Sequence, residues 1–225
     1  MVILASDRSL GRLYCLLRNR FGFQDWWPGE TTDEIFISAI LTQNTSWVNV
    51  EKAMLNLRRR HLLDISSISS SNLRTLETAI KPSGFYKQKA RRLKNISSYI
   101  CSKYGSLSKM LGADADTLRR ELLSMDGIGP ETADCILLYA AEKPIFVVDA
   151  YTCRIMSRIY NLPEMGYEEM QELVTSGITK NVELYNDFHA QFVKLGKDYC
   201  KKNKPLCKNC PAKQICIYYK KTKGN

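Results

Sequence analysis

The chain has 225 residues, 44% of them hydrophobic, which is enough to bury a sizeable core as one domain or as two compact lobes. Its 33 lysine and arginine residues against 23 acidic residues give a formal net charge of +10. This excess favours a polyanionic partner, and nucleic acid, a membrane surface and plain solubility all fit it. No run approaches the roughly 18 apolar residues of a membrane span and no targeting segment stands out, so we expect a soluble intracellular protein.

Apolar residues recur at helical spacing through most of the chain, and no useful length alternates as a strand would. The predicted helices cover residues 9–20, 34–41, 50–60, 71–80, 86–104, 115–124, 132–141 and 150–160. Thr32 or Asp33 is the expected cap of the second helix, and the serine-rich stretch 66–71 is expected to be a turn. The sequence therefore predicts an all-α fold.

Positive charge gathers in two segments. Residues 80–94 contain six basic side chains and no acid, and residues 197–225 contain nine lysines and one acid. Both are candidate phosphate-contact surfaces. A solvated helix face and a loose tail explain the two segments equally well.

Aromatic residues gather near the amino terminus, where Trp26, Trp27 and Pro28 follow two phenylalanines and precede Trp47. Such clusters usually belong to a hydrophobic core. Between them and Trp47 lies Gln43, in the polar stretch LTQNTSW, which has the composition of a helix connector.

Two glycines, Gly127 and Gly129, separate two predicted helices and allow a sharp turn. Pro130 suits the first position of the second helix, and Glu131 places an acid in its first turn. Backbone amides at a helix start that glycine leaves accessible form an anion site suited to a phosphate. A simple helix connector would have the same sequence.

The apolar run Ile145 to Val148 leads to Asp149 at the start of the helix 150–160. An aspartate at this position is a natural helix N-cap. This role is compatible with a catalytic role for the same carboxylate.

Four of the eight cysteines form the spacing C-x6-C-x2-C-x5-C near the carboxy terminus, at Cys200, Cys207, Cys210 and Cys216. In an intracellular chain this density favours a metal site over disulfides. Four thiolates suit either tetrahedral zinc or a [4Fe–4S] cluster. The remaining four, Cys15, Cys101, Cys135 and Cys153, are expected to be buried thiols.

The hairpin GIGPETAD, the run VVDAYTCR that follows it and the cysteine spacing together resemble the helix-hairpin-helix DNA glycosylases of the endonuclease III superfamily. The aromatic segments are most similar to those of the 3-methyladenine DNA glycosylases related to endonuclease III. The resemblance extends from about residue 21 to residue 216.

The resemblance implies two helical lobes with the active site in the cleft between them. Residues 25–134 would form a helical barrel lobe, and residues 1–24 plus 135–225 a second lobe with a cluster loop at 200–216. It further implies a [4Fe–4S] cluster rather than zinc. The expected partner is double-stranded DNA containing a damaged base, bound by a monomer in the cytoplasm, at the nucleoid.

The same resemblance assigns roles to individual residues. Asp149 would stabilise the positive charge that develops on the sugar and activate water. Gln43 would fill the gap left by the extruded base, and Phe85 or Tyr86 would be a second wedge. The base pocket would consist of Trp26, Trp27, Pro28 and Trp47. Phosphate contacts would come from Gly127, Ile128, Gly129, Lys201 and Lys202.

Bifunctional members of the superfamily carry, just after the hairpin, a lysine that attacks the sugar to form an imine. Glu131 occupies that position here, and a carboxylate cannot form an imine. We therefore expect a monofunctional glycosylase, unless another lysine substitutes. The alternatives are an endonuclease III-type glycosylase and lyase acting on oxidised or mismatched pyrimidines, and a non-catalytic module that binds damaged DNA. His189 either faces the cleft or is a structural histidine of the core.

Overall fold

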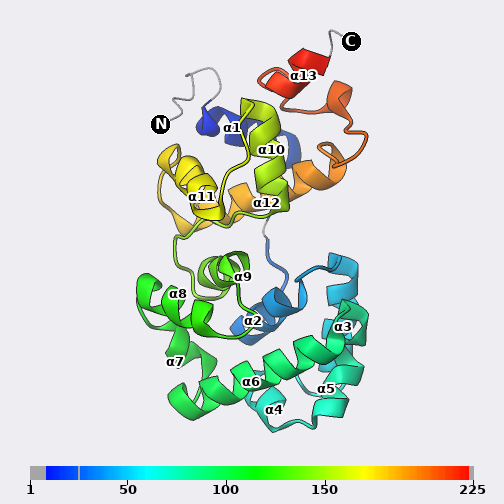
Figure 1. Ribbon diagram of the computed structural model, residues 1–225, viewed down its shortest axis with the longest axis vertical. Helices are drawn as coiled ribbons and strands as arrows, with labels where there is room; N and C mark the ends of the chain where they lie inside the picture. Colours follow the sequence, from blue (N-terminus) through cyan, green and yellow to red (C-terminus); the bar gives the residue numbers. More distant parts are fainter. Residues whose placement is uncertain (1–8, 25, 223–225) are drawn as a thin grey trace. The chain divides into compact units, whose positions relative to one another are not determined.

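The computed structural model describes residues 9–24 and 26–222, and no strand occurs among them (Figure 1). The predicted all-α fold is therefore confirmed. The chain divides into two compact units: the middle unit is residues 27–143, and the terminal unit combines the chain before Trp27 with the chain from Pro144 on. Asp25, the expected first residue of the barrel lobe, and residues 1–8 and 223–225 of the other expected lobe lie outside the described residues.

The middle unit contains eight of the α-helices in the described part of the chain. They are α2 (Thr32–Leu41), α3 (Trp47–Arg58), α4 (Ile65–Ser70), α5 (Leu73–Ile80), α6 (Tyr86–Tyr104), α7 (Leu107–Leu111), α8 (Ala115–Ser124) and α9 (Pro130–Cys135). Two short helical segments, η2 (Lys81–Ser83) and η3 (Ile136–Ala140), follow α5 and α9. The 19-residue α6 packs against α4, α5 and α7, and α2 packs against α3, α6 and η3.

Helix α2 is buried almost all round, from Phe36 to Leu41. Its one buried acid, Glu34, is paired with Arg58 of α3 at 3.1 Å, so the charge does not lie unpaired in the core. The N-cap is Thr31, whose side chain accepts from the Glu34 amide, and not Thr32 or Asp33 as expected. Asp33 is instead used across the unit, where it accepts from the Ile65 amide at 2.8 Å.

The structure differs from the expectation at two further places in the middle unit. The serine-rich stretch forms helix α4, because Asp64 caps it and Ile65 and Ile68, three residues apart, both turn into the core. The unit also ends after Lys143 rather than after Asp134. The reason is that η3, a π-helical turn with a fully buried Ile136, packs against α2.

The terminal unit is formed by α1 (Leu10–Phe21), α10 (Ala150–Tyr160), α11 (Tyr167–Ser176), α12 (Val182–Asp198), η4 (Cys207–Asn209) and α13 (Ile217–Thr222). Its core is aromatic: Phe188 and Phe192 stack at 4.7 Å on α12, and Phe146 meets both edge-on. Helix α1 adds Leu10, Leu13 and Leu17, spaced so that one stripe of the helix faces α12.

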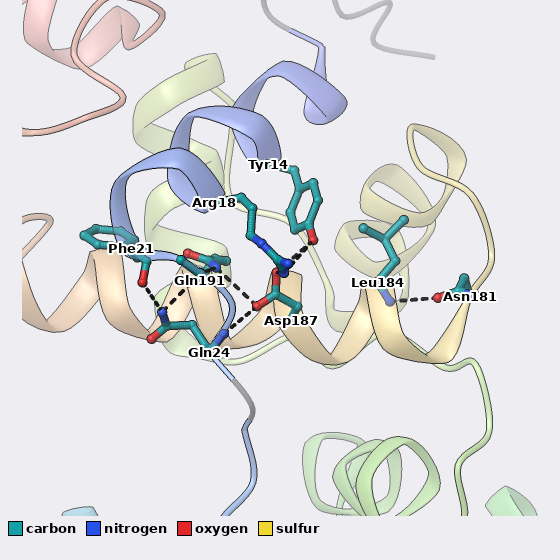
Figure 2. A network of polar contacts seen from close by, with 9 residues as sticks. Tyr14, Arg18, Phe21, Gln24, Asn181, Leu184, Asp187 and Gln191 are labelled. Atoms are coloured by element: carbon teal, nitrogen blue, oxygen red, sulfur yellow. Dashed lines mark hydrogen bonds and ion pairs between the residues drawn. The ribbon is translucent and has the colours of Figure 1, made fainter.

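A buried carboxylate, Asp187, joins α1 to α12 (Figure 2). It accepts from the Tyr14 hydroxyl at 2.8 Å, from Arg18 at 2.7 Å and from the Gln24 amide at 2.9 Å. Burial and this carboxylate raise the pKa of Tyr14 to about 12, so the hydroxyl remains a donor. Four donors, Gln191 included, satisfy a charge that would otherwise be costly to bury.

The four cysteines outside the carboxy-terminal set do not all meet the expectation of burial. Cys135 is buried, Cys101 and Cys153 are partly exposed, and Cys15 is exposed. Cys15 belongs to α1, whose buried stripe is Leu10, Leu13 and Leu17, so its position turns to solvent. Among the described residues, no helix has the length and apolar character needed to cross a membrane.

Candidate active site and DNA-contact elements

Asp149 caps α10 as expected, and its two carboxylate oxygens have different surroundings. Oδ1 accepts from the Thr152 amide at 2.7 Å and from the Thr152 hydroxyl at 2.9 Å. Oδ2 lies 3.6 Å from Nε2 of His189 on α12, and the side chain is 13% exposed. Burial alone would raise the pKa of Asp149, but His189 and the Thr152 donors outweigh it and lower the pKa below its ordinary value. The carboxylate is therefore ionised at neutral pH.

The loop that delivers Asp149 is held from α11. Gln171 donates to the Phe146 carbonyl at 2.6 Å, and the Val148 amide donates to the Tyr167 hydroxyl at 3.4 Å. Phe146, Val147 and Val148 are buried, so the backbone just before Asp149 is held in place at the start of α10. The sequence gives no signal for Gln171 or Tyr167, because they lie about twenty residues downstream on a helix that we did not predict.

The hairpin between α8 and α9 has the expected turn, but its two glycines have different conformations and different roles. Gly127 has φ +84°, which only glycine adopts readily. Gly129 is extended, with φ −93°, and a side chain added there would meet nothing within 4 Å. Its amide makes no hydrogen bond within the described residues, whereas the Ile128 amide donates to the Met125 carbonyl. The expected phosphate site therefore has open space and a free donor at Gly129.

The remaining hairpin residues are divided between core and surface. Ile128 is buried, so only its backbone faces the turn. Pro130 begins α9 as predicted, and Glu131 is exposed in its first turn.

Gln43 is bonded to the hairpin itself. Its side-chain nitrogen donates to the Gly127 carbonyl at 2.8 Å and to the Thr132 hydroxyl at 3.0 Å. The turn after α2 and the helix-hairpin-helix element are therefore joined directly, although 84 residues separate Gln43 from Gly127. The sequence predicted a functional role for both elements but not this contact.

Phe85 and Tyr86, the two candidates for the wedge, differ in exposure. Phe85 is 68% exposed and adopts a left-handed backbone conformation, with φ +44°, at the start of α6. Tyr86 is only partly exposed. A large apolar side chain held in solvent by a costly backbone conformation is typical of a functional position, which favours Phe85.

The basic segment 80–94 is not one continuous phosphate surface. Lys89 is buried, Lys94 donates to the carbonyls of Ser69 and Ser71, and Arg92 is paired with Asp126 at 3.2 Å. Lys87 and Arg91 remain exposed. In the second segment, Lys201 and Lys202 are exposed beside the cysteines.

The aromatic residues expected to form one pocket are divided between the units. Trp27 meets Trp47 edge-on at 5.2 Å and Tyr139 at 4.9 Å, and it donates to Ser38 at 2.8 Å. Pro28, next to it, is exposed. Trp26 belongs to the terminal unit, where the Lys197 ammonium lies 5.3 Å from its ring. Tyr139 was missed because its spacing on a predicted helix is that of an ordinary core residue.

All four cysteines of the carboxy-terminal set are free thiols and line one cavity, whose walls come from α10, α12 and α13. Burial and the neighbouring cysteines raise the pKa values of Cys207, Cys210 and Cys216, that of Cys210 to about 12. Arg158 donates to the Cys200 sulfur at 3.3 Å and to the Lys201 carbonyl at 2.7 Å. Arg158 was not among the predicted site residues. Its only signal in the sequence was its spacing of four residues from Arg154, which donates to the Cys200 carbonyl.

The chain is similar in sequence to known DNA repair proteins. The sequence pattern of the HhH-GPD superfamily of base excision DNA repair proteins matches residues 37–180. The chain is 46% identical over 209 residues to a protein of Methanocaldococcus jannaschii named as a DNA repair glycosylase, covering 92% of this chain and 94% of that one. It is 31% identical over 187 residues to endonuclease III of Thermotoga maritima, covering 83% of each.

Two solved structures have the same fold. The H. pylori 3-methyladenine DNA glycosylase bound to 1,N6-ethenoadenine superimposes with a TM-score of 0.75 at 28% identity, covering 83% of this chain and 96% of that one. A non-covalent endonuclease III–DNA complex superimposes with a TM-score of 0.82 at 22% identity, over the whole of both chains. The chain therefore belongs to the HhH-GPD superfamily of base excision DNA repair proteins, as an endonuclease III-like helix-hairpin-helix DNA glycosylase.

Proposed function

We propose that this protein removes an alkylated purine, such as 3-methyladenine, from DNA by hydrolysing its N-glycosidic bond, and leaves an abasic site. The observation that carries the proposal is the state of Asp149: a nearly buried carboxylate, ionised at neutral pH, with one oxygen fixed as a helix cap. That oxygen holds the side chain in one orientation. Oδ2 then remains for the reaction.

The chemistry suits a single carboxylate. Departure of the base leaves positive charge on the sugar, and an anion near the sugar stabilises that charge more than it stabilises the uncharged sugar of the substrate. The same carboxylate can accept a proton from the attacking water. An N-alkylated purine is already cationic and is a good leaving group, so no acid has to protonate it.

Base selection would rest on aromatic surfaces. The rings of Trp27, Trp47 and Tyr139 contact one another in the middle unit. Aromatic rings attract a cationic base more strongly than a neutral one. The solved 3-methyladenine DNA glycosylase bound to 1,N6-ethenoadenine, at 28% identity, supports this choice of substrate. Pro28, exposed beside Trp27 in the middle unit, would belong to the same pocket.

We propose that the protein lacks lyase activity, because Glu131 stands where the bifunctional enzymes carry their lysine. Lys89, a buried lysine with a lowered pKa, is no substitute, since three backbone carbonyls occupy its ammonium group.

DNA would be held by elements of both units. The Gly129 amide would bind a backbone phosphate, together with the hairpin residues Gly127 and Ile128. Phe85 would enter the duplex where the base has left it. Gln43 would enter there as well, after its side chain exchanges its hydrogen bonds to Gly127 and Thr132 for contacts with DNA. Lys201 and Lys202 would contact phosphates from the terminal unit.

We further propose that Cys200, Cys207, Cys210 and Cys216 hold a [4Fe–4S] cluster. Four free thiols around one cavity fit such a group. The spacing of the four cysteines resembles that of the endonuclease III cluster loop, which favours a [4Fe–4S] cluster over a single zinc ion. Once bound, the cluster would cross-link the loop that carries Lys201 and Lys202.

The test is base release from duplexes that each contain one defined lesion: an alkylated purine, thymine glycol, or a uracil or thymine mismatch. Products are scored with and without alkali, and imine formation is tested by trapping with borohydride. We expect release of the alkylated purine, with strand breaks only after alkali and no trapped complex.

Two other outcomes would contradict the proposal in different ways. Excision of oxidised or mismatched pyrimidines with direct nicking would support an endonuclease III-type enzyme, the alternative favoured by the 31% identity to endonuclease III. Tight binding to an abasic-site analogue with no base released from any duplex would support a non-catalytic binding module.

A further inference from the structure

Lys89 makes an unusual set of contacts for a lysine on a helix. Its ammonium donates to the carbonyls of Leu41, Gln43 and Ser83, each at 2.8 Å, which uses all three N–H bonds. The residue is only 3% exposed. Lys89 is therefore fully satisfied within the protein and is not available to bind phosphate.

The three carbonyls belong to two separate loops. Leu41 and Gln43 lie at the end of α2 and in the turn that follows it, and Ser83 ends η2, two residues before Phe85. The Lys89 amide also donates to the Phe85 carbonyl at 3.0 Å. The side chain of Lys89 therefore holds the backbone of Gln43 and that of Ser83, and its amide makes an ordinary first-turn helical bond to Phe85.

The contacts continue from Gln43 into the hairpin. Its side chain donates to Gly127 and Thr132, so Lys89 is linked through Gln43 to the start of α9. The two segments proposed to enter DNA and the segment proposed to grip its backbone are thus bonded to one another within the middle unit.

Joining two loops through a buried ammonium group costs free energy, because the charge loses its hydration. Burial lowers the pKa of Lys89 to about 8, which shows that its surroundings disfavour the charge. An apolar side chain of similar length would fill the same space without this cost. An apolar side chain would not supply the three N–H donors of the ammonium group. The fixed directions of these donors determine the distance between the two loops.

We propose that Lys89 is a positioning residue that fixes the Gln43 turn relative to the Phe85 loop, so that both side chains enter the distorted duplex together. This inference rests on the proposed DNA-insertion roles of Gln43 and Phe85. Lys89 itself touches neither DNA nor the reacting atoms.

Helix α6 provides a matched control. Lys94, five residues further along it, donates to the carbonyls of Ser69 and Ser71 at 2.7 and 2.6 Å. It therefore also joins a loop to α6 through backbone carbonyls. The segment that it holds, which is the end of α4 and the turn before α5, has no proposed contact with DNA.

The experiment compares Lys89→Met with Lys94→Met in the full-length holoprotein. The readout is the preference for a duplex with an abasic-site analogue over the same intact duplex, and thermal unfolding shows that each variant is folded. We expect Lys89→Met to reduce the preference about tenfold, the scale of one lost base-stacking contact, with little change in binding to intact DNA. Lys94→Met should leave the preference unchanged. If Lys89→Met does not fold, Lys89→Gln, which keeps two donors and no charge, replaces it.

A variant lacking both insertion side chains, Gln43→Ala with Phe85→Ala, separates the possible failures. If Lys89 acts through those side chains, its replacement lowers the preference no further in this background. An equal loss in both backgrounds, or an unchanged preference in Lys89→Met alone, would overturn the inference. If the variant lacking both side chains itself keeps the full preference, the insertion roles in the proposed function are wrong, and the role of Lys89 falls with them.

Discussion

Replacing Asp149 with asparagine separates the two roles of this residue, because each carboxylate oxygen has its own partner. Asparagine keeps an oxygen in place of Oδ1, which accepts from Thr152, and exchanges Oδ2, which faces His189, for an amide nitrogen. Asparagine and aspartate are about equally good N-caps, so we expect the stability to change by less than about 1 kcal/mol. Asp149→Ala, which loses the cap as well, should cost about 1 kcal/mol more, or roughly 2–4 °C in Tm for a chain of this size.

Catalysis should respond very differently. Loss of the charge that stabilises the developing cation and of the group that accepts a proton from water should slow base release by about 10³-fold or more. The measurement is single-turnover release of an alkylated purine by each variant, beside thermal unfolding and binding to an abasic-site duplex. Both variants should be almost inactive, whereas only Asp149→Ala should be destabilised.

Binding gives a further check on the same substitution. Removing a negative charge near DNA should leave the affinity of Asp149→Asn for abasic-site DNA unchanged or raise it. If Asp149→Asn released the base within tenfold of the wild-type rate, the carboxylate would be only a helix cap and the proposed mechanism would be refuted.

Three further predictions follow from the site. His189→Gln removes a group that lowers the pKa of Asp149, so the pKa of Asp149 should rise. In the wild type the carboxylate stays ionised below its ordinary pKa of 3.8. The variant should therefore lose activity in acid at a higher pH than the wild type does. An unshifted acid limb of the pH–rate profile would show that His189 does not act on Asp149. Cys210→Ala should abolish the iron and sulfide content, which should be about four of each per chain in the wild type. Cys101→Ala, the control, should keep this content. Zinc in place of iron in the wild type would contradict the cluster. Glu131→Lys should add a borohydride-trapped complex and strand cleavage, because an exposed amine at that position can form an imine; base release without trapping would show that the position does not reach the sugar.

Much of the local structure could be predicted from the sequence because the signals were local. Helix α6 has the predicted bounds, and Pro130 and Asp149 begin their helices as expected. In each case the preference is a property of a few adjacent residues. Helix α4 was missed because serine favours turns, and the burial of Ile65 and Ile68 outweighed that preference.

The tertiary roles could not be predicted in this way. Lys87 and Lys89 are two residues apart in one basic segment, yet the first is exposed and the second is buried against three carbonyls. Nothing in the segment distinguishes them, because the carbonyls come from loops that only the folded chain brings to α6. The bonds from Gln43 to the hairpin and from Arg158 to the cysteine loop have the same origin.

The division of the chain has a consequence for the order in which it folds during synthesis. The middle unit is one continuous segment, whereas the terminal unit needs both ends of the chain. Arg18 and Asp187, which join α1 to α12, are 169 residues apart. On a ribosome that emits the amino terminus first, residues 27–143 can fold as a body while Leu10, Leu13 and Leu17 of α1 still wait for their partners. Helix α1 is thus the nascent segment that presents an unpaired apolar stripe for longest, and chaperones would be expected to engage the growing chain there.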